Sequence, residues 1–338
     1  MSNIDWSSIG FGYIKTNKNI RAIYKDGKWG DFYLTEEETI PIHMSASGLH
    51  YGTEIFEGLK AFRGIDGKIR LFRPDENAKR MQRSAEMICM QSLPVDRFVE
   101  ACLEVVRANE EFVPPYESGA TLYLRPFIFA SEAVLGVKPA KEFIFCIFVS
   151  PVGPYFKGGM SPIDVIIDVD YDRAAPRGTG GAKCGGNYAA SLYCGERAHE
   201  KGFSNNLFVD AVERKYIEEC GAANFFGIKD NTYITPTSPS ILRSITNMSL
   251  RTLAAEEYGL KVEERKIALD ELPTFEECGA CGTAAVISPI GSVSDYRHDE
   301  KISYGTEPGK YCTLMYNKLQ DIQYGRCEDK FGWTVVVE

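Results

Sequence analysis

A proline- and glycine-rich segment near the middle of the chain constrains the fold most. Residues 151–162, PVGPYFKGGMSP, hold three prolines and three glycines in twelve positions. Such a composition is typical of the stretches between domains, because both residue types interrupt helices and strands. A chain of 338 residues is also long enough for two domains. We therefore predict a small N-terminal domain over 1–150, an interdomain loop over 151–162 and a larger C-terminal domain over 163–338.

Hydrophobic periodicity predicts both helices and strands in the first domain. Apolar residues recur at helical spacing over 75–90 and about 95–112, where they fall on one side of each helix. Two later segments, 121–130 and 142–150, are rich in aromatic and β-branched residues, as buried strands are. The first domain is therefore expected to be of the α+β type.

The second domain shows shorter elements in closer succession. We expect a strand over 164–172, a helix over 185–202 that ends at Gly202, and a further helix over about 246–258. Between these helices we expect four short strands in meander order, over 206–210, 215–220, 224–229 and 232–235. The chain as a whole is thus expected to fall in the α/β and α+β classes.

Charge and cysteine usage exclude several classes of function. With 47 acidic and 38 basic residues the net charge is -9, which argues against a protein that works on nucleic-acid backbones. The longest apolar stretches, such as 143–149, are too short to span a bilayer, so we expect no membrane role. The ten cysteines are scattered and indicate reduced thiols in a cytoplasmic protein.

Two other patterns are weak. Cys278 and Cys281 form a Cys-x-x-Cys pair, but neither a second such pair nor a histidine pair at ligand spacing accompanies it, so we expect no metal. The four histidines are dispersed and no nucleophile elbow is present. A hydrolase is therefore a weak alternative.

The most unusual stretch runs from Arg177 to Tyr188, where five glycines surround Lys183. A phosphate-binding P-loop would need glycine before the lysine and serine or threonine after it, but Ala182 and Cys184 stand there. A dinucleotide fingerprint fails too, because it needs glycine where Lys183 stands. A lysine held among glycines suits a Schiff base, and a flexible loop with a solvated lysine is an equally good alternative.

Two adjacent carboxylates, Glu218 and Glu219, lie at the end of a predicted strand. Strand alternation sends them to opposite faces, so one can face a ligand while the other is solvated. Beside a pyridine cofactor, such a carboxylate keeps the ring nitrogen protonated. Without that context, an exposed strand pair is the more ordinary interpretation.

Several segments could hold a phosphate or carboxylate. A helix start at Ser244-Ile245-Thr246 would offer free N–H groups, although an ordinary N-cap explains it as well. Arg80 could supply a bidentate contact or lie on a solvated helix face. The turn after Gly282, with Thr283 and Ala284, could hold an anion or be a simple tight turn.

Taken together, these motifs resemble those of the fold-type IV pyridoxal-phosphate enzymes, and specifically the branched-chain amino acid aminotransferases. The resemblance covers nearly the whole chain, including the glutamate strand and the Gly-Thr-Ala turn. Its other blocks are His50–Gly58, Leu71–Asp75, Tyr123–Pro126, Pro151–Tyr155 and Lys183–Tyr188. The closing Asp321–Gly325 is similar to the longer subgroup that includes the animal enzymes.

The resemblance implies a two-domain, D-amino acid aminotransferase-like architecture with pyridoxal 5'-phosphate in the interdomain cleft. It also implies ping-pong transamination through a Schiff base at Lys183. The amino group would pass reversibly between L-leucine, L-isoleucine or L-valine and 2-oxoglutarate. A homodimer is implied as well, with small-molecule substrates as the other partners.

Site residues follow from their positions in the matching motifs. Lys183 would be the catalytic lysine, Tyr188 would bond the cofactor's ring hydroxyl and Glu219 its pyridine nitrogen. The cofactor's phosphate would be held by Arg80, Ile245, Thr246 and Thr283, with Arg173 nearby. The substrate would be bound by Phe56, Tyr51, Tyr123, Arg125, Tyr155, Leu242, Thr283 and Ala284, with Tyr51 reaching across a dimer interface. Arg125 is expected to bind the glutamate side chain within an otherwise apolar pocket.

The chain departs from the family pattern in places. Where Leu-Pro-Gly-Val-x-Arg is usual, it has Leu242-Arg-Ser-Ile-Thr-Asn247, which puts the shape of the phosphate loop in question. The redox cysteines of animal members are replaced by Ala285 and Ser288, and Ala222 stands where several members have threonine. Two rival interpretations remain, a D-amino acid aminotransferase and a phosphate-ligand binding protein without covalent chemistry.

Overall fold

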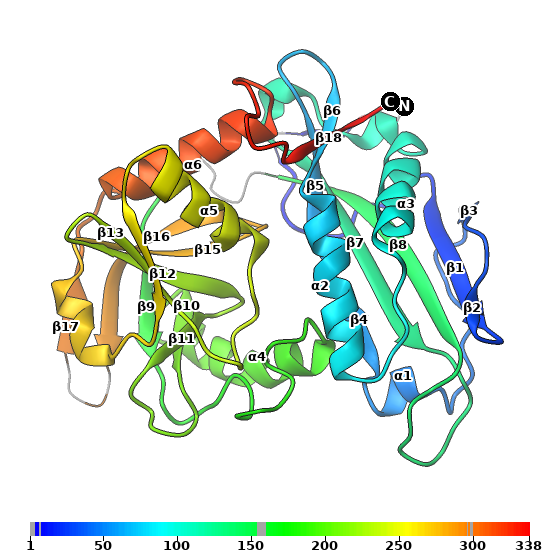
Figure 1. Ribbon diagram of the computed structural model, residues 1–338, viewed down its shortest axis with the longest axis horizontal. Coiled ribbons are helices and arrows are strands. Elements are labelled where there is room, and N and C mark those ends of the chain that lie inside the picture. Colours follow the sequence, from blue (N-terminus) through cyan, green and yellow to red (C-terminus); the bar gives the residue numbers. More distant parts are fainter. Residues whose placement is uncertain (1–3, 7, 154–159, 296, 298–299) are drawn as a thin grey trace. The chain divides into compact units, whose positions relative to one another are not determined.

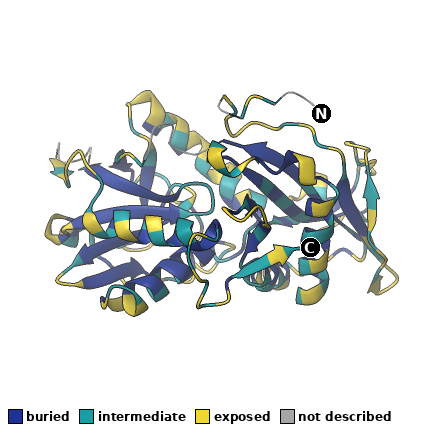
Figure 2. Cartoon of the chain, turned by 90° about the horizontal axis from the view of Figure 1, so that it is seen from above, coloured by how far each residue is buried: buried dark blue, intermediate teal, exposed yellow. Residues whose placement is uncertain are grey.

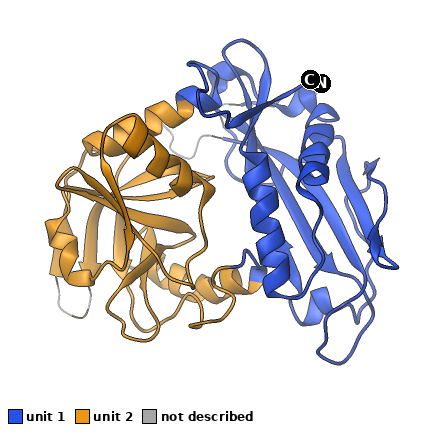
Figure 3. Cartoon of the chain, in the orientation of Figure 1, with its two compact units in different colours: residues 1–155, 182–185, 321–338 blue, residues 156–181, 186–320 orange. Residues whose placement is uncertain are grey.

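The structure is a computed structural model that describes residues 4–6, 8–153, 160–295, 297 and 300–338. The chain divides into two compact units (Figure 3). Unit 1 holds residues 1–155, 182–185 and 321–338, and unit 2 holds residues 156–181 and 186–320. Within the described residues, each unit is built on a nine-stranded sheet. Figure 2 shows that most residues of these strands are buried, whereas exposed residues lie mainly on helices and loops.

Unit 1 is an antiparallel sheet with helices on one face (Figure 1). Its strands are β1 (Asn19–Lys25), β2 (Lys28–Trp29), β3 (Tyr33–Thr35), β4 (Glu54–Phe56), β5 (Leu59–Arg63), β6 (Ile69–Phe72), β7 (Thr121–Ala130), β8 (Phe143–Val152) and β18 (Thr334–Val337). They are joined in the order β18-β6-β5-β7-β8-β1-β2, with β3 on β1 and β4 on β7. The helices are α1 (Ser47–His50), α2 (Pro74–Met87) and α3 (Val95–Arg107), with 3-10 turns η1 (Glu110–Phe112) and η2 (Tyr116–Ser118).

The predicted elements of the first domain are confirmed, with both helices shorter than expected: α2 ends at Met87, three residues before its predicted end. Strands β7 and β8 pair in full antiparallel register, from Thr121 opposite Val152 to Ala130 opposite Phe143. Helix α3 ends at Arg107, five residues before its predicted end. The physical reason is Asn109, whose buried side chain bonds the backbone N–H and carbonyl of Lys18 and so competes with a continued helix.

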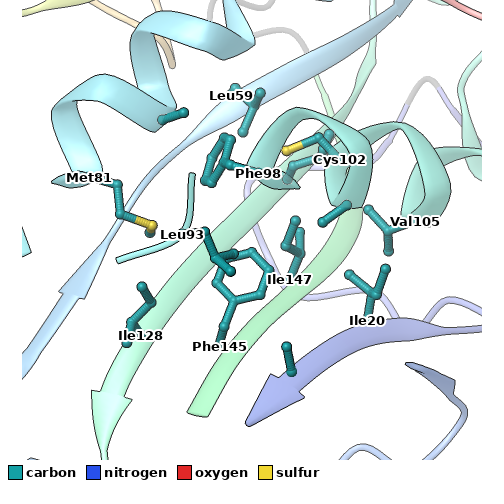
Figure 4. Packing of buried hydrophobic residues seen from close by; sticks show 14 of the residues in the cluster. Ile20, Leu59, Met81, Leu93, Phe98, Cys102, Val105, Ile128, Phe145 and Ile147 are labelled. Carbon is teal, nitrogen blue, oxygen red and sulfur yellow. The ribbon is translucent and has the colours of Figure 1, made fainter. Parts of the chain in front are cut away.

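Figure 4 shows the core beneath α2 and α3. One cluster is formed by Met81 of α2, Phe98, Cys102 and Val105 of α3, Ile128 of β7, Phe145 and Ile147 of β8, and Ile20 of β1. These side chains are nearly or fully buried. Each such burial contributes about 1.5–3 kcal/mol, so the apolar stripes seen in the sequence hold the helices on the sheet.

Unit 2 is a mixed sheet whose strands alternate along the chain with helices. Its strands are β9 (Ile163–Ile167), β10 (Asn205–Val209), β11 (Ile217–Cys220), β12 (Ala223–Lys229), β13 (Thr232–Pro236), β14 (Lys261–Arg265), β15 (Glu277–Gly282), β16 (Val286–Asp295) and β17 (Glu300–Ser303). Its helices are α4 (Gly185–Glu200), α5 (Ile245–Glu256), η3 (Leu269–Thr274) and α6 (Lys310–Gln323). The sheet order is β11-β10-β9-β16-β15-β12-β13-β14, with β17 on β16.

The sheet of unit 2 closes on itself. Strand β11 pairs with β10 and also with β12, so β11, β10, β9, β16, β15 and β12 form a ring. Closure removes the free edge of β11 and surrounds a core that includes Val165, Leu207 and Phe225. The turn between β11 and β12 lies at this point of closure, which is where Glu219 is placed.

Most predicted elements of the second domain are also confirmed. The four meander strands are β10 to β13, within two residues of their predicted bounds. Helix α4 ends at Glu200, and Gly202 follows it with a φ of 85°, in the left-handed region that favours glycine after a helix. The strand expected over 164–172 is shorter, because the Asp168 side chain accepts a hydrogen bond from the Asp170 backbone and starts a turn.

The predicted division at 151–162 stays a prediction, and residues 154–159 of that segment lie outside the described residues. The compact units place two later segments, 182–185 and 321–338, with unit 1. Strand β18 explains the second assignment, since it pairs with β6 from Thr334 opposite Phe72 to Val337 opposite Ile69. Among the described residues, no helix is long and apolar enough to cross a membrane.

Candidate active site

Lys183 is anchored to unit 1 by its backbone. Its N–H donates to the Ser84 hydroxyl at 2.9 Å, and its carbonyl accepts a hydrogen bond from the Phe56 N–H at 3.0 Å. The side chain is partly buried, with Nζ 4.6 Å from the centre of the Phe56 ring. The glycines permit this approach, because a Cβ on Gly185 would overlap the Glu54 carboxylate. These contacts favour a positioned lysine over a solvated loop.

Phe56, Tyr123 and Arg125 form an aromatic cluster that includes a cation. Tyr123 and Arg125 lie two residues apart on β7 and therefore share a face of the sheet. Arg125 donates to the Tyr123 hydroxyl at 3.1 Å, and its guanidinium carbon is 5.0 Å from the centre of the Phe56 ring. Within the described residues, the buried Nε of Arg125 has no hydrogen-bond partner. A Cβ on Gly58 would collide with the Tyr123 hydroxyl, so this glycine leaves room for the cluster.

Glu54 and Lys60 border this cluster and were missed by the sequence analysis. Glu54 lies two residues before Phe56 on the same strand and accepts a hydrogen bond from the Gly185 N–H. Lys60 is buried on β5, directly opposite Tyr123 in the register, and burial lowers its pKa to about 8. The available signal was alternate spacing along the chain, since Glu54 stands two residues before Phe56 and Lys60 stands four residues after it.

Arg80 is buried, with 5% of its surface exposed, against the fully buried Glu57. Its Nε and one terminal nitrogen donate to the two carboxylate oxygens at 2.8 and 2.6 Å. Asn77 donates to the same carboxylate at 2.8 Å. The interpretation of Arg80 as part of a solvated helix face is therefore wrong, because Glu57 compensates its charge inside the protein. Glu57 was missed, although a glutamate within the apolar segment 55–62 was the available signal.

Glu219 occupies a comparable place in unit 2. It is 3% exposed, and one of its oxygens accepts the Leu242 N–H at 2.6 Å and lies 3.3 Å from a terminal nitrogen of Arg173. Arg173 also donates to the carbonyls of Gly180 and Ser240. The structure thus makes Arg173 a positioning group for Glu219, and its expected place beside a phosphate stays a prediction.

The expectation that one of the two adjacent glutamates is solvated is wrong. Glu218 is buried like Glu219 and accepts a hydrogen bond from Ser238 at 2.7 Å. Burial raises the pKa of Glu218 above its ordinary value, and the Ser238 hydrogen bond opposes that shift. The physical reason is the segment 238–242, which bonds to both carboxylates and covers them.

The start of α5 shows the shape of the loop before it, where the sequence Leu242–Asn247 departs from the family pattern. Ser244 is the N-cap, and its hydroxyl accepts the Asn247 N–H at 3.2 Å. The helix therefore begins at Ile245 with Thr246 in its first turn, as predicted. Asn247 is held by Thr235 and by the Tyr233 hydroxyl. The loop is thus closed by a serine cap where the family usually has glycine.

The remaining predicted residues are placed as follows. Thr283 and Ala284 lie in the turn between β15 and β16, and Tyr188 lies in the first turn of α4. Tyr51 is exposed and donates to the Leu135 carbonyl at 2.7 Å, away from the Phe56 cluster. Tyr155 lies outside the described residues.

Among the described residues, the cysteines form no disulfide. Cys278 and Cys281 are buried in β15, and burial raises the pKa of both. Among the residues that the structure describes, no group of three or more His, Cys, Asp or Glu side chains could hold a metal ion. Because their pKa values are raised, the reactive thiolate form of Cys278 and Cys281 is disfavoured.

Comparison with known proteins gives consistent results. Residues 54–293 match the family described as "Amino-transferase class IV". The chain is 50% identical to the branched-chain-amino-acid aminotransferase of Haemophilus influenzae, over all of both chains. It is similar in structure to the Escherichia coli branched-chain amino acid aminotransferase, with a TM-score of 0.78 and 29% identity over 94% of this chain and 99% of that chain.

Two solved complexes bear on ligands. Both are of a Thermus branched-chain amino acid aminotransferase, one with N-(5'-phosphopyridoxyl)-L-glutamate and one with 4-methylvaleric acid. Each matches this chain with a TM-score of 0.76 and 25% identity over 96% of this chain and all of that chain.

Proposed function

The chain belongs to the class IV aminotransferase family, and from that premise we propose that it is a branched-chain amino acid aminotransferase that uses pyridoxal 5'-phosphate. Its two-sheet architecture is that of the fold-type IV aminotransferases, as the sequence resemblance implied. The amino group passes between L-leucine, L-isoleucine or L-valine and 2-oxoglutarate. The observation that carries the substrate assignment is the aromatic cluster of Phe56 and Tyr123 around the Arg125 guanidinium.

The donor set fits the cofactor. Lys183 supplies an amine for the aldehyde, and the buried Glu219, held by Arg173 and Leu242, supplies a carboxylate for the protonated ring nitrogen. The N–H groups of Ile245 and Thr246 at the start of α5 suit a phosphate, and Arg80 and Thr283 are the further donors assigned to it. Tyr188 is assigned to the ring hydroxyl. When bound, the cofactor delocalises the negative charge that develops at the substrate Cα.

The protein's own groups then divide the work. Lys183 would hold the cofactor and would also move the proton at the substrate Cα. Glu219 keeps the ring nitrogen protonated, because Arg173 and the Leu242 N–H hold its carboxylate in place. Thr283 and Ala284 are assigned to the substrate carboxylate.

One pocket accepts two chemically different side chains in this proposal. The faces of Phe56 and Tyr123 bind a branched aliphatic side chain. The Arg125 guanidinium binds the second carboxylate of glutamate, a charge-assisted contact with strong geometric preference. Leu242 and Tyr155 remain assigned to the apolar wall.

We also propose a homodimer in the cytoplasm. Exposed apolar side chains gather on unit 1 where the segments 43–51 and 131–141 are hydrogen-bonded to each other. This patch consists of Met44, Leu49, Tyr51, Leu135 and Val137. A patch of this kind marks an interaction site, and it supports the expectation that Tyr51 reaches a second copy. The lack of disulfides among the described cysteines supports a reducing compartment.

A direct assay tests the activity. Purified protein supplied with pyridoxal phosphate should form glutamate from L-leucine and 2-oxoglutarate and should leave D-alanine unchanged. The Lys183→Ala variant, prepared in the same way, should lose turnover. Preference for D-alanine, or full turnover by the variant, would overturn the proposal.

A further inference from the structure

Glu54 places a negative charge on the strand face that carries Phe56, the ring contacted by Arg125. Glu54 and Phe56 lie on the same face of β4, because they are two residues apart. Phe56 in turn is in cation–π contact with Arg125 of the neighbouring strand β7, which pairs with β4. The carboxylate fills the space left by the missing side chain of Gly185 and accepts that residue's N–H. Glu54 is thus fixed between the aromatic cluster and the Lys183 loop, at the border of the proposed substrate pocket.

The two charges affect each other. Burial raises the pKa of the Glu54 carboxyl above its ordinary value, whereas the Gly185 N–H and the positive charge of Arg125 oppose that rise. Arg125 is partly exposed in the free protein and makes few hydrogen bonds with the described residues. It donates to the Tyr123 hydroxyl, and its buried Nε has no hydrogen-bond partner among the described residues.

We propose that Glu54 is the counter-charge of Arg125 and sets the balance between glutamate and branched side chains in the substrate pocket. The inference rests on the proposed function, since it concerns how that pocket chooses between its two substrates. It makes Glu54 a specificity-determining residue that acts through Arg125.

Glu54 affects the binding of the two substrates in opposite ways. A branched side chain brings no charge, so it desolvates Arg125 without compensation, and a buried cation without a counter-charge is costly. Glu54 lowers that cost. The side-chain carboxylate of glutamate compensates Arg125 by itself, and the negative charge of Glu54 then repels it. Glu54 therefore favours leucine binding at the expense of glutamate binding.

The test compares two unreactive analogues, glutarate and 4-methylvalerate, on the cofactor-loaded protein. The Glu54→Gln variant removes the charge but keeps an oxygen that can accept the Gly185 N–H. Dissociation constants are measured by titration calorimetry. Glutarate should bind about fivefold to tenfold more tightly to the variant, and 4-methylvalerate several-fold more weakly. KM for 2-oxoglutarate should likewise fall, and KM for L-leucine should rise.

Three controls separate this role from a structural one. Glu276→Gln makes the same substitution at an exposed carboxylate of unit 2 that also accepts a backbone N–H, that of Asp230, and it should change neither constant. In an Arg125→Gln background, Glu54→Gln should no longer weaken 4-methylvalerate binding, because the uncompensated cation is gone. Glu54→Ser, a smaller neutral side chain, should reproduce the effect if the glutamine variant fails to fold.

Parallel changes for both analogues, or no change, would overturn the inference. Wild-type turnover of L-leucine with 2-oxoglutarate is measured first. If the wild type is inactive, the proposed function fails. If it is active and the two analogues respond alike, only the role of Glu54 fails.

Discussion

Both units bury a glutamate against an arginine, but the proposed function uses the two pairs in opposite ways. In unit 1, Glu57 holds Arg80 through two contacts of 2.6 and 2.8 Å, and the arginine is the group assigned to the cofactor. In unit 2, Arg173 holds Glu219 through one contact at 3.3 Å, and the glutamate is assigned to the cofactor. The Leu242 N–H completes the second pair at 2.6 Å.

This difference shows what buried ion pairs do in this protein. A buried pair adds little net stability, since desolvation offsets the attraction. It does fix the position of each charge before a ligand arrives, which is what electrostatic catalysis requires. The bidentate pair leaves Glu57 as a purely positioning residue, whereas the single long contact orients Glu219, the residue assigned to the ring nitrogen.

The largest expected effect comes from breaking the pair in unit 1. Glu57→Ala should lower the free energy of unfolding by about 3–5 kcal/mol, because it leaves Arg80 buried without a counter-charge. Urea denaturation with and without pyridoxal phosphate measures it. Asp75→Ala is the matched control on α2, since it removes an exposed partner of Lys79 and should change stability by less than about 1 kcal/mol. Equal effects of the two substitutions would remove the distinction.

Breaking the pair in unit 2 should affect catalysis more than stability. Glu219→Gln cannot hold the ring nitrogen protonated, so kcat for L-leucine should fall on the order of 100-fold. Steady-state kinetics with saturating cofactor measures the loss. The neighbouring Glu218 bonds to Ser238 instead, and Glu218→Gln should retain most of the activity. A larger loss for Glu218→Gln would mean that the roles are reversed.

Lys60 differs from the charges of these two ion pairs, because burial shifts its pKa from 10.5 down to about 8. Below pH 8 both the folded and the unfolded chain bind this proton, so the full cost of burying the charge is present. Between pH 8 and 10.5 the unfolded chain binds more protons, so stability rises with pH.

Lys60→Met should therefore be more stable than the wild type at about pH 7, and the gap should narrow by about 2 kcal/mol at about pH 9.5. Denaturant unfolding of both proteins at the two pH values checks this. A gap that does not depend on pH would show that the charge of Lys60 is not disfavoured.

The sequence predicted elements whose pattern is local. The stripes of α2 and α3, the long strands β7 and β8 and the meander of unit 2 all follow from periodicity within about ten to twenty residues. Strand β18 could not be predicted from local pattern, because its partner β6 lies more than 250 residues earlier. The closure of the unit 2 ring depends likewise on β11 pairing with strands on both sides.

The same limit applies to the candidate site. Lys183, Arg80 and Glu219 belong to motifs that can be recognised along the chain. The role of Glu54 depends on its hydrogen bond with Gly185, which is distant in sequence. The role of Glu57 depends in the same way on its contact with Arg80. A motif identifies the residue that contacts the ligand. The second residue, which holds the first in position, can be identified only from the fold that brings the two residues together.

The measurement that tests the account most directly is the chemical identification of the lysine that carries the cofactor. The holoenzyme is reduced with borohydride, which makes a lysine–pyridoxal linkage permanent, and is then digested and analysed by mass spectrometry. The account predicts a phosphopyridoxyl group on the peptide that contains Lys183, and no label after incubation with excess L-leucine before reduction. A label on another lysine, or none on a protein that turns over leucine, would contradict it.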